Sequence, residues 1–287
     1  MLTLRTLIGG NDVVVAPGAF NGLMAMLAKA AGFRALYLSG GSLGWLKGVT
    51  EATIALPDMT DAAVEIRTVC DLPLILDAAG GFGDPVHMHR TIAMAEAVGF
   101  AAIEIEDQVL PKRMGHHVGE DRTIPQEMMV AKLTEAVAAR TNPDFVIIAR
   151  TDASRSHGLD EALRRGEAYR RAGADVIFVA YTTKAETFRT IGQHLGGPLM
   201  AFAPHAGLDA LPIPMPELVT IGYRLLAAPQ IPLLVLHKAM RQFYTSYVRG
   251  GPDPLVGADS TAEYTAVQET VGLPRLLDIE RRTMGGR

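Results

Sequence analysis

Residues 101–122 read AAIEIEDQVLPKRMGHHVGEDR, and this stretch decides how the rest of the chain is interpreted. It opens as an apolar run typical of a buried strand and ends in two neighbouring carboxylates, Glu106 and Asp107. A cationic, glycine-containing loop follows, with Lys112 and His116. An ionised carboxylate at the end of a buried strand is costly unless a metal, a cation or hydrogen bonds compensate it. The combination predicts an active site on a scaffold of alternating strands and helices.

Short apolar runs of the same kind recur along the chain. Helical patterns stop at Gly32, Gly99, Gly173 and Gly222, and an apolar run follows each glycine within a few residues. Glycine suits the left-handed residue that ends a helix, because it has no Cβ that would clash there. Continuous apolar runs are typical of parallel strands that are buried on both faces. Strands are therefore expected at residues 13–16, 35–38, 74–76, 101–105, 145–149, 176–179, 199–202 and 225–226.

About eight strands alternating with helices predict an α/β fold of the (β/α)8 TIM-type barrel class. A doubly wound open sheet is the main alternative, but no G-x-G-x-x-G motif follows the first expected strand. Helices are expected to begin at Thr60, Asp84 and Asp160. No linker-like segment interrupts the sequence, so we expect one domain over residues 1–287, with a C-terminal helical extension from about residue 230.

Composition limits the classes of function. The chain has 287 residues, 48% of them hydrophobic, which is enough for one large domain with a substantial core. Its formal net charge of -4 gives no basic field, so nucleic acid is not an expected partner. Cys70 is the only cysteine, which excludes an intrachain disulfide and fits a reducing compartment. No apolar run approaches the roughly 18 residues of a membrane span, and no signal peptide is evident, so we expect a cytoplasmic protein without a membrane partner.

Chemistry in a (β/α)8 barrel gathers at the C-terminal ends of the strands, and polar residues are expected there. The turn at residues 39–41 can offer a hydroxyl and backbone N–H groups to a carboxylate, or it can be an ordinary tight turn. Arg150 can bind a carboxylate through its planar fork, or it can form a structural salt bridge with Asp152 or Glu106. If the turn and Arg150 bind a ligand, both favour a carboxylic acid.

Asp77 and Glu106 are both expected at the ends of buried strands. Together they can hold a hard cation through oxygen ligands and waters. Mg2+ fits this pattern, because it takes one or two carboxylates and keeps several waters. The alternative is that each carboxylate simply pairs with Arg150 or Lys112.

These motifs, in this order, resemble the isocitrate lyase/phosphoenolpyruvate mutase superfamily. Its smaller members include methylisocitrate lyase, dimethylmalate lyase, oxaloacetate decarboxylase, phosphonopyruvate hydrolase and carboxyphosphonoenolpyruvate phosphonomutase. The resemblance runs from about residue 15 to residue 221. It rests on APGAFNG at 16–22, YLSG at 37–40, DA at 77–78, IEDQ at 105–108, PKR at 111–113, GH at 115–116 and IARTDA at 148–153.

The resemblance implies a (β/α)8 barrel, usually a homotetramer whose paired subunits exchange a C-terminal helix. It also implies Mg2+, or Mn2+ in its place, and a substrate with a pyruvyl or glyoxylyl unit that becomes or stabilises an enolate. By motif match, the catalytic residues would be Lys112, His116 and Arg150. Asp77 would be a direct metal ligand, and Glu106 would bind the metal through water. The substrate-binding residues would be Tyr37, Ser39, Gly40, Gly41, Asp77, Gly115 and Arg150.

Several positions depart from the pattern of the resembled family. Ala79 stands where an aspartate is usual, so one acidic group near the metal is missing. Met114 stands where the lyases carry a cysteine, and a thioether cannot give or take a proton. His116 or the neighbouring histidine can substitute for that acid. Ala180 and Phe202 replace polar residues, which points to a less polar and differently charged substituent on the substrate.

The resembled family usually has an aspartate in the loop that corresponds to residues 41–60, and this chain has no clear equivalent of it. Asp58, Glu51 or neither of them takes its place. Three hypotheses of function follow. The leading one is a Mg2+-assisted carbon–carbon lyase or decarboxylase that acts on a small 2-oxo or 2-hydroxy acid. The others are a phosphonate P–C mutase or hydrolase, and a non-catalytic member that binds 2-oxo acids.

Overall fold

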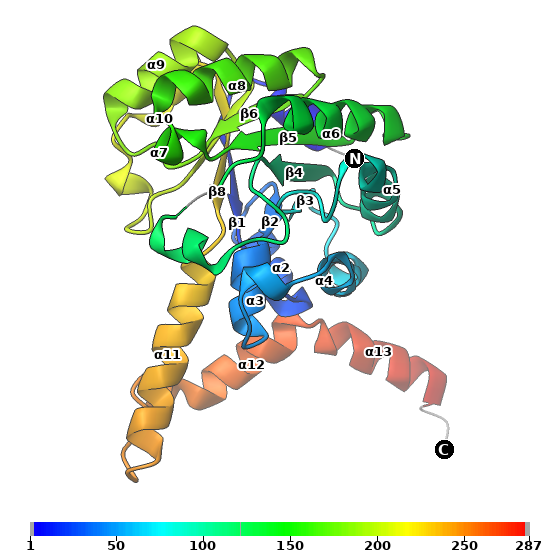
Figure 1. The fold of residues 1–287 in the computed structure, drawn as a ribbon. Coiled ribbons are helices and arrows are strands. Elements are labelled where there is room, and N and C mark those ends of the chain that lie inside the picture. Colours follow the sequence, from blue (N-terminus) through cyan, green and yellow to red (C-terminus); the bar gives the residue numbers. More distant parts are fainter. Residues whose placement is uncertain (1–2, 121, 285–287) are drawn as a thin grey trace.

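The structure is a computed structural model that describes residues 3–120 and 122–284. Eight parallel strands form a barrel that is surrounded by helices, and a helical arm extends below it (Figure 1). The strands are β1 Val14–Pro17, β2 Leu36–Leu38, β3 Leu74–Asp77, β4 Ala102–Glu106, β5 Val146–Thr151, β6 Val176–Val179, β7 Leu199–Phe202 and β8 Tyr223–Ala228. Each expected strand is confirmed, with ends that differ by a residue or two.

The barrel is nearly closed. The strands follow the order β1-β8-β7-β6-β5-β4-β3-β2, and β1 pairs with β8 in a parallel register that aligns Val14 with Leu225. The remaining seam, between β1 and β2, is joined by a bridge between Gly18 and Tyr37. Across it, Ala19 N donates to Tyr37 O at 3.1 Å. The (β/α)8 prediction is confirmed, and the open-sheet alternative is wrong.

Helices connect the strands on the outside of the barrel. They are α1 Leu4–Ile8, α2 Gly22–Ala30, α3 Gly40–Leu46, α4 Leu56–Val69, α5 Met88–Ala97, α6 Gln126–Ala139, α7 Ala153–Ser156, α8 Leu159–Arg171, α9 Ala185–Leu195, α10 Met215–Thr220, α11 Ile231–Tyr247, α12 Ser260–Thr270 and α13 Leu273–Met284. Short 3-10 helices are η1 Glu51–Thr53, η2 Pro85–His87, η3 Met114–Val118, η4 Leu208–Ala210 and η5 Gly257–Asp259. The four glycines expected to end helices all have positive φ angles, between 85° and 101°.

One predicted helix start is wrong. We expected Thr60 to cap a helix, but α4 begins at Leu56, and Thr60 lies inside its first turns. Asp58 supplies the first-turn acceptor instead, because its carboxylate accepts a hydrogen bond from Ala55 N at 3.0 Å. Pro57 occupies an early position where its missing N–H costs nothing. The other two starts differ little: Asp84 precedes η2, and α8 begins one residue before Asp160.

The core has two layers, because side chains alternate along each strand. One set, including Ile75, Val146 and Leu225, fills the barrel interior, and a larger set packs between the barrel and the helices. Leu4 and Leu7 of α1 belong to the interior set. Interior packing of this kind makes the barrel a solid core rather than a pore, and polar groups collect where the strands end.

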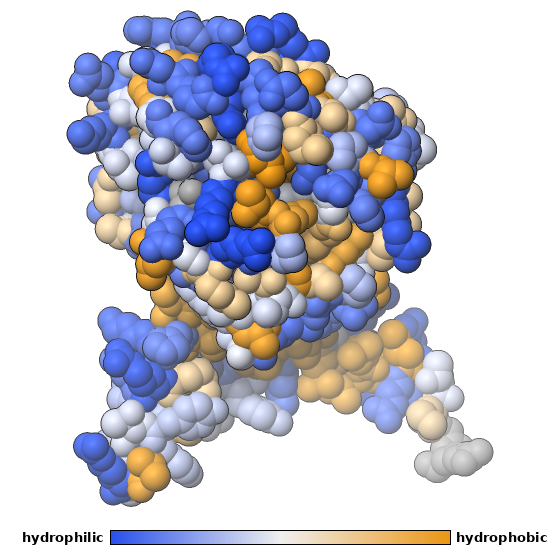
Figure 2. Space-filling view, viewed as in Figure 1, coloured by the Kyte–Doolittle hydropathy of each residue, from blue (hydrophilic) through white to orange (hydrophobic). Residues whose placement is uncertain are grey.

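The C-terminal arm consists of α11, α12 and α13, and it extends below the barrel (Figure 1). Leu276 and Leu277 of α13 are 55% and 44% exposed. Hydrophobic surface gathers around α12 and α13 below the barrel (Figure 2). Among the described residues, no helix combines the length and apolar character that crossing a bilayer requires.

Candidate active site

A cavity of about 770 Å3 lies at the C-terminal ends of the strands. Six of the residues predicted for the site line it directly: Ser39, Gly41, Asp77, Lys112, His116 and Arg150. They come from the start of α3, from β3 and β5, and from the loop after β4, so segments far apart in the sequence meet here. The fold therefore concentrates charged side chains at the one end of the barrel where a ligand has access.

Ser39 and Asp77 are fixed by backbone hydrogen bonds. The Ser39 hydroxyl oxygen accepts from Ser42 N at 3.3 Å and caps α3, so the turn is a helix start. Asp77 accepts from Gly40 N at 3.3 Å and from Ala79 N at 3.1 Å. Burial is the main cause that raises the pKa of Asp77, and the negative charge of Glu51 adds to it. Each Asp77 oxygen keeps lone-pair capacity for a further partner.

Lys112 lies between two carboxylates, one from η1 and one from the end of β4. Its Nζ is 2.7 Å from Glu51 Oε1 and 2.7 Å from Glu106 Oε1. Burial alone would raise the pKa of Glu51, but Lys112 and His116 outweigh it and lower that pKa. The pKa of Glu106 is raised to about 7, chiefly by burial. The Lys112 pKa is raised, because Glu106 and Glu51 together outweigh the cost of burying its charge.

Glu51 is the acid of the loop between residues 41 and 60 that lines the cavity. It lies in η1, and a Cβ added at Gly41 would be only 3.5 Å from its Oε2, so it lies over the turn that begins α3. Asp58 is in a different place, at the start of α4, where it pairs with Lys47 at 3.0 Å. The carboxylate that faces the cavity from this loop is therefore Glu51.

Arg150 is surrounded by acids. It donates to Asp152 through Nε at 2.8 Å and through Nη2 at 3.2 Å, and Nη1 donates to Glu104 at 3.2 Å. Nη1 is also 3.3 Å from Glu106 Oε2. The structural salt bridges weighed for Arg150, Glu106 and Lys112 are thus present, and they coexist with the cavity. Neither Glu106 oxygen has an aligned hydrogen bond among the described residues, so these contacts act through charge.

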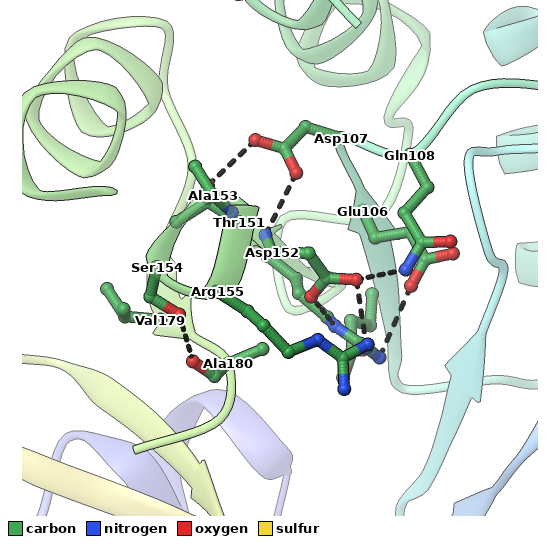
Figure 3. Close-up of polar contacts among 12 residues, drawn as sticks. Glu106, Asp107, Gln108, Thr151, Asp152, Ala153, Ser154, Arg155, Val179 and Ala180 are labelled. Atoms are coloured by element: carbon green, nitrogen blue, oxygen red, sulfur yellow. Dashed lines mark hydrogen bonds and ion pairs between the residues drawn. The ribbon is translucent and has the colours of Figure 1, made fainter. Parts of the chain in front are cut away.

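The Asp107 carboxylate has different partners from that of Glu106. Its carboxylate accepts from Thr151 Oγ1 at 2.7 Å, from Arg165 Nη1 at 2.9 Å and from Tyr169 Oη at 2.8 Å. Figure 3 shows it turned toward Thr151, while Gln108 reaches toward Asp152. Because neighbouring strand residues face opposite sides, Asp107 joins the strand end to α8. Of the two neighbouring acids, Glu106 is the one whose carboxylate pairs with the cavity-lining residues Lys112 and Arg150.

The loop after β4 brings two histidines over the cavity. His116 Nδ1 is 2.6 Å from Arg113 O, and its Nε2 is 3.2 Å from Glu51 Oε2. Both neighbours of the ring are hydrogen-bond acceptors. His117 stacks on Trp45 with 5.7 Å between ring centroids, and burial lowers the pKa of His117. Trp45 also lines the cavity, as an aromatic lid would.

The other predicted residues lie outside the cavity wall. Tyr37 is fully buried in the barrel, where its hydroxyl donates to Glu104 at 2.7 Å. Glu106 is 1% exposed and lies behind Lys112. Gly40 contributes its N–H to Asp77, and Gly115 lies in η3 against Glu120.

Glu104 is a functional candidate that the sequence reasoning missed. It lies on the same face of β4 as Glu106, two residues away, and connects Tyr37 with Arg150 beneath the cavity. Burial is the main cause that raises its pKa to about 8. A signal was available, because alternate residues of a strand share a face and AIEIE places two acids on one side.

The carboxylates of this site suit a hydrated divalent cation. In the described part of the chain, no three His, Cys, Asp or Glu side chains converge as a ready set of ligands. Asp77 has free lone pairs, and oxygen is the donor that Mg2+ prefers. Ala79 has a φ of 47°, a conformation that aspartate adopts more readily than alanine. The residues present fit Mg2+ held directly by one carboxylate and otherwise through water.

Comparison with known proteins gives the family. The profile described as phosphoenolpyruvate phosphomutase matches residues 4–247. The chain is 34% identical to 2,3-dimethylmalate lyase of Eubacterium barkeri, over 99% of this chain and 98% of that protein. It is 39% identical to 2-methylisocitrate lyase of Aeropyrum pernix, over 79% of this chain and 73% of that protein. A crystal structure of phosphonopyruvate hydrolase with oxalate and Mg2+ has a TM-score of 0.84 and 27% identity, covering 98% of both chains.

The fold and the charged cavity at its strand ends define a (β/α)8-barrel enzyme. The chain belongs to the phosphoenolpyruvate mutase/isocitrate lyase superfamily. It is accordingly an enzyme of the carbon–carbon lyase kind that its named relatives represent.

Proposed function

We propose that this enzyme is a metal-assisted carbon–carbon lyase or decarboxylase that acts on a small 2-oxo or 2-hydroxy acid through a pyruvate-type enolate. The observation that carries the proposal is the meeting of Ser39, Asp77, Lys112 and Arg150 in one cavity. The names of the lyase relatives support cleavage of a carbon–carbon bond.

The substrate carboxylate would bind between the Ser39 turn and Arg150. The Ser39 oxygen accepts from Ser42 N, so its hydroxyl proton remains available to a carboxylate. Arg150 supplies a planar set of donors at the base of the cavity, and the acids around it hold its orientation. Both groups are buried, which strengthens their interaction with an anion.

A malate-type acid would lose the proton of its 2-hydroxyl group, and the bond between carbons 2 and 3 would break. Carbon 2 leaves in a 2-oxo acid, and the electron pair of the broken bond remains on the other fragment as an enolate. Carbon 3 of that fragment takes up one proton, which balances the proton lost from the hydroxyl group, so no oxidant or reductant is consumed. With oxaloacetate, carbon dioxide leaves and the enolate is that of pyruvate. Lys112 and Arg150 would stabilise the enolate charge.

The proposed cofactor is Mg2+ or Mn2+, held directly by Asp77 and through water by Glu106. When bound, such a cation withdraws charge from the enolate oxygen as a Lewis acid. The Mg2+ named in the phosphonopyruvate hydrolase complex supports this choice.

The proton donor we propose is His116. Met114 is 54% exposed, accepts from Thr50 Oγ1 through its sulfur, and lies outside the cavity lining. His116 lines the cavity, and its Nε2 is 3.2 Å from Glu51 Oε2. It therefore offers the acid that the methionine position cannot supply.

Two other functions remain candidates. The structural similarity to phosphonopyruvate hydrolase favours phosphonate chemistry, which does not need the missing cysteine. The charge balance disfavours it, because Lys112 and Arg150 are already paired with carboxylates. The other is a non-catalytic protein that binds 2-oxo acids: Ala79 and Met114 favour it, and the lyase relatives count against it.

A thermal-shift titration with oxalate, an analogue of the pyruvate enolate, tests the proposal. A ligand that binds only the native state raises the melting temperature. We expect a shift with oxalate that grows when Mg2+ or Mn2+ is added, and we expect release of a 2-oxo acid or carbon dioxide from malate-type acids or oxaloacetate. Asp77→Asn should abolish the metal-dependent part of the shift while it leaves the fold intact. The absence of both shift and turnover would overturn the proposal.

We also propose a homotetramer in the cytoplasm, as the family resemblance implies. The apolar residues exposed on α12 and α13 support assembly. Cys70 is buried and free, in agreement with a reducing compartment. The partners would be the small acid and identical subunits.

A further inference from the structure

The cavity has two chemically different halves. The half that belongs to β2, β3 and the loop after β4 carries the titratable side chains, Glu51, Asp77, Lys112 and His116. The half that belongs to β6, β7 and the segments after them is largely apolar. The main apolar side chains of its wall are Phe178, Phe188, Ala201, Phe202, Leu211 and Pro212.

Arg150 lies at the boundary between these halves. Its Cζ is 5.4 Å from the centre of the Phe178 ring and 5.4 Å from the centre of the Phe202 ring. The two rings pack edge to face with 4.7 Å between their centroids. A carboxylate held at Arg150 would therefore place the adjoining part of the acid beside these two rings.

The apolar half has no buried cation among the described residues that line it. Arg155 and His205 are exposed at its rim, and Arg155 lies over the Tyr181 ring at 3.7 Å. Thr182 and Gln230 add neutral polar groups. An extra carboxylate or phosphonate in this half would lose its hydration without gaining a buried cation, which is costly. Burial of an apolar group there would instead stabilise binding by about 25 cal/mol for each Å2 of apolar surface removed from water.

The cavity is also larger than the reacting part of the substrate requires. Its volume of about 770 Å3 corresponds to roughly 25 water molecules at about 30 Å3 each. Pyruvate has only six non-hydrogen atoms. Space next to the reacting carbons is therefore available, and most of its wall on the β6–β7 side is aromatic or aliphatic.

We propose that the physiological acid carries an apolar substituent longer than a methyl group, alkyl or aryl, which packs against Phe178, Phe188 and Phe202. The carboxylates of the acid stay in the charged half. This inference rests on the proposed function and assigns a substrate class within it. The substituent takes no part in bond cleavage, so the products are a 2-oxo acid and a carboxylic acid, one of which carries the apolar group.

The test is the dependence of kcat/KM on chain length. Malates with hydrogen, methyl, ethyl, propyl or butyl at carbon 2 or carbon 3 are assayed with Mg2+ by release of the 2-oxo acid. Burial of each CH2 is worth about 0.8 kcal/mol, so kcat/KM should rise roughly four-fold per added CH2 until the pocket is full. A carboxymethyl substituent of similar size should give a lower value than propyl. A flat or falling series, or a preference for the carboxymethyl acid, would overturn the inference.

Two variants at one position separate polarity from size. Phe202→Leu and Phe202→Asn both remove the ring and leave side chains with the same branched arrangement of four heavy atoms. We expect the leucine variant to keep a rise with chain length and the asparagine variant to lose most of it. Equal slopes in the two variants would show that the Phe202 wall does not contact the substituent, contrary to the inference.

The experiments can disprove the apolar-substituent inference and the lyase function separately. Turnover of the unsubstituted acids without a gain from chain length removes the apolar-substituent inference and leaves the lyase function in place. Absence of turnover for every acid, with no stabilisation by oxalate and Mg2+, removes both.

Discussion

Glu104 shows at the scale of one residue how the barrel interior controls charge. Its carboxyl group is 1% exposed, accepts a hydrogen bond from the Tyr37 hydroxyl and faces Arg150. Burial raises its pKa to about 8, so the folded protein keeps a proton on this group that the unfolded chain has already lost. The side chain that orients Arg150 therefore changes its charge within the working range of pH.

The first prediction concerns the stability of Glu104→Gln as a function of pH. The folded pKa lies above the unfolded value, so the native state binds the extra proton, and stability falls as pH rises from about 4.5 towards 8. Glutamine imitates the protonated carboxyl and does not titrate. We expect the melting temperature of the wild type to fall more than that of the variant between pH 5.5 and pH 8. Parallel curves in differential scanning calorimetry would contradict this.

Gly18 matters at the scale of the elements, because it closes the barrel after β1. Its N–H donates to Ala228 O at 3.0 Å, and it bridges to Tyr37 of β2. A Cβ at this position would lie 2.4 Å from Pro229 O, a backbone atom directly after β8 that cannot move without shifting the end of β8 away from β1. Two strands therefore approach each other at a point where only glycine fits.

The second prediction is that Gly18→Ala weakens this closure. Overpacking of this kind costs roughly 1–3 kcal/mol, and each kcal/mol lowers the melting temperature by about 2–4 °C in a domain of this size. Gly9→Ala is the matched control, since Gly9 is exposed, has a negative φ and would bring its Cβ no closer than 3.3 Å to a neighbour. Equal melting temperatures for the two variants would count against the role of Gly18.

At the scale of the whole molecule, the C-terminal arm of α11, α12 and α13 extends away from the barrel (Figure 1). Its helices carry exposed apolar side chains, including Tyr264 of α12 and Leu276 of α13. Figure 2 shows hydrophobic surface around these helices, below the barrel. Apolar patches of this kind mark interaction surfaces, which agrees with the proposed assembly into a homotetramer.

The third prediction is that the native mass is four times the 30.7 kDa of one chain. Light scattering after size exclusion measures it directly. The double change Leu276→Glu with Leu277→Glu should lower that mass, because charge in an apolar interface is unfavourable. Val86→Glu is the control, since Val86 is 75% exposed on the barrel, away from the arm. A monomeric wild type, or a double variant of unchanged mass, would rule out assembly through α13.

The strand ends could be predicted from the sequence, because they depend on local patterns of apolar and polar residues. Apolar runs located all eight strands, four of them after a helix-ending glycine, and the residues at and after the strand ends located Ser39, Asp77, Lys112 and Arg150. Thr60 was misjudged as a cap because a proline and an aspartate just before it form the helix start instead. The metal, the tetramer and the roles of the site residues remain predictions.

The sequence by itself determined the barrel, the superfamily and the segments that carry the charged residues, since strand periodicity and short motifs are local properties of the chain. Only the tertiary structure decided that Glu51 rather than Asp58 faces the cavity, that Asp107 turns away toward α8, and that Glu104 lies beneath Arg150. It also decided that the cavity is charged on one side and apolar on the other. These outcomes depend on which face of each strand or loop meets another element across the barrel, and that is set by packing between segments far apart in the sequence.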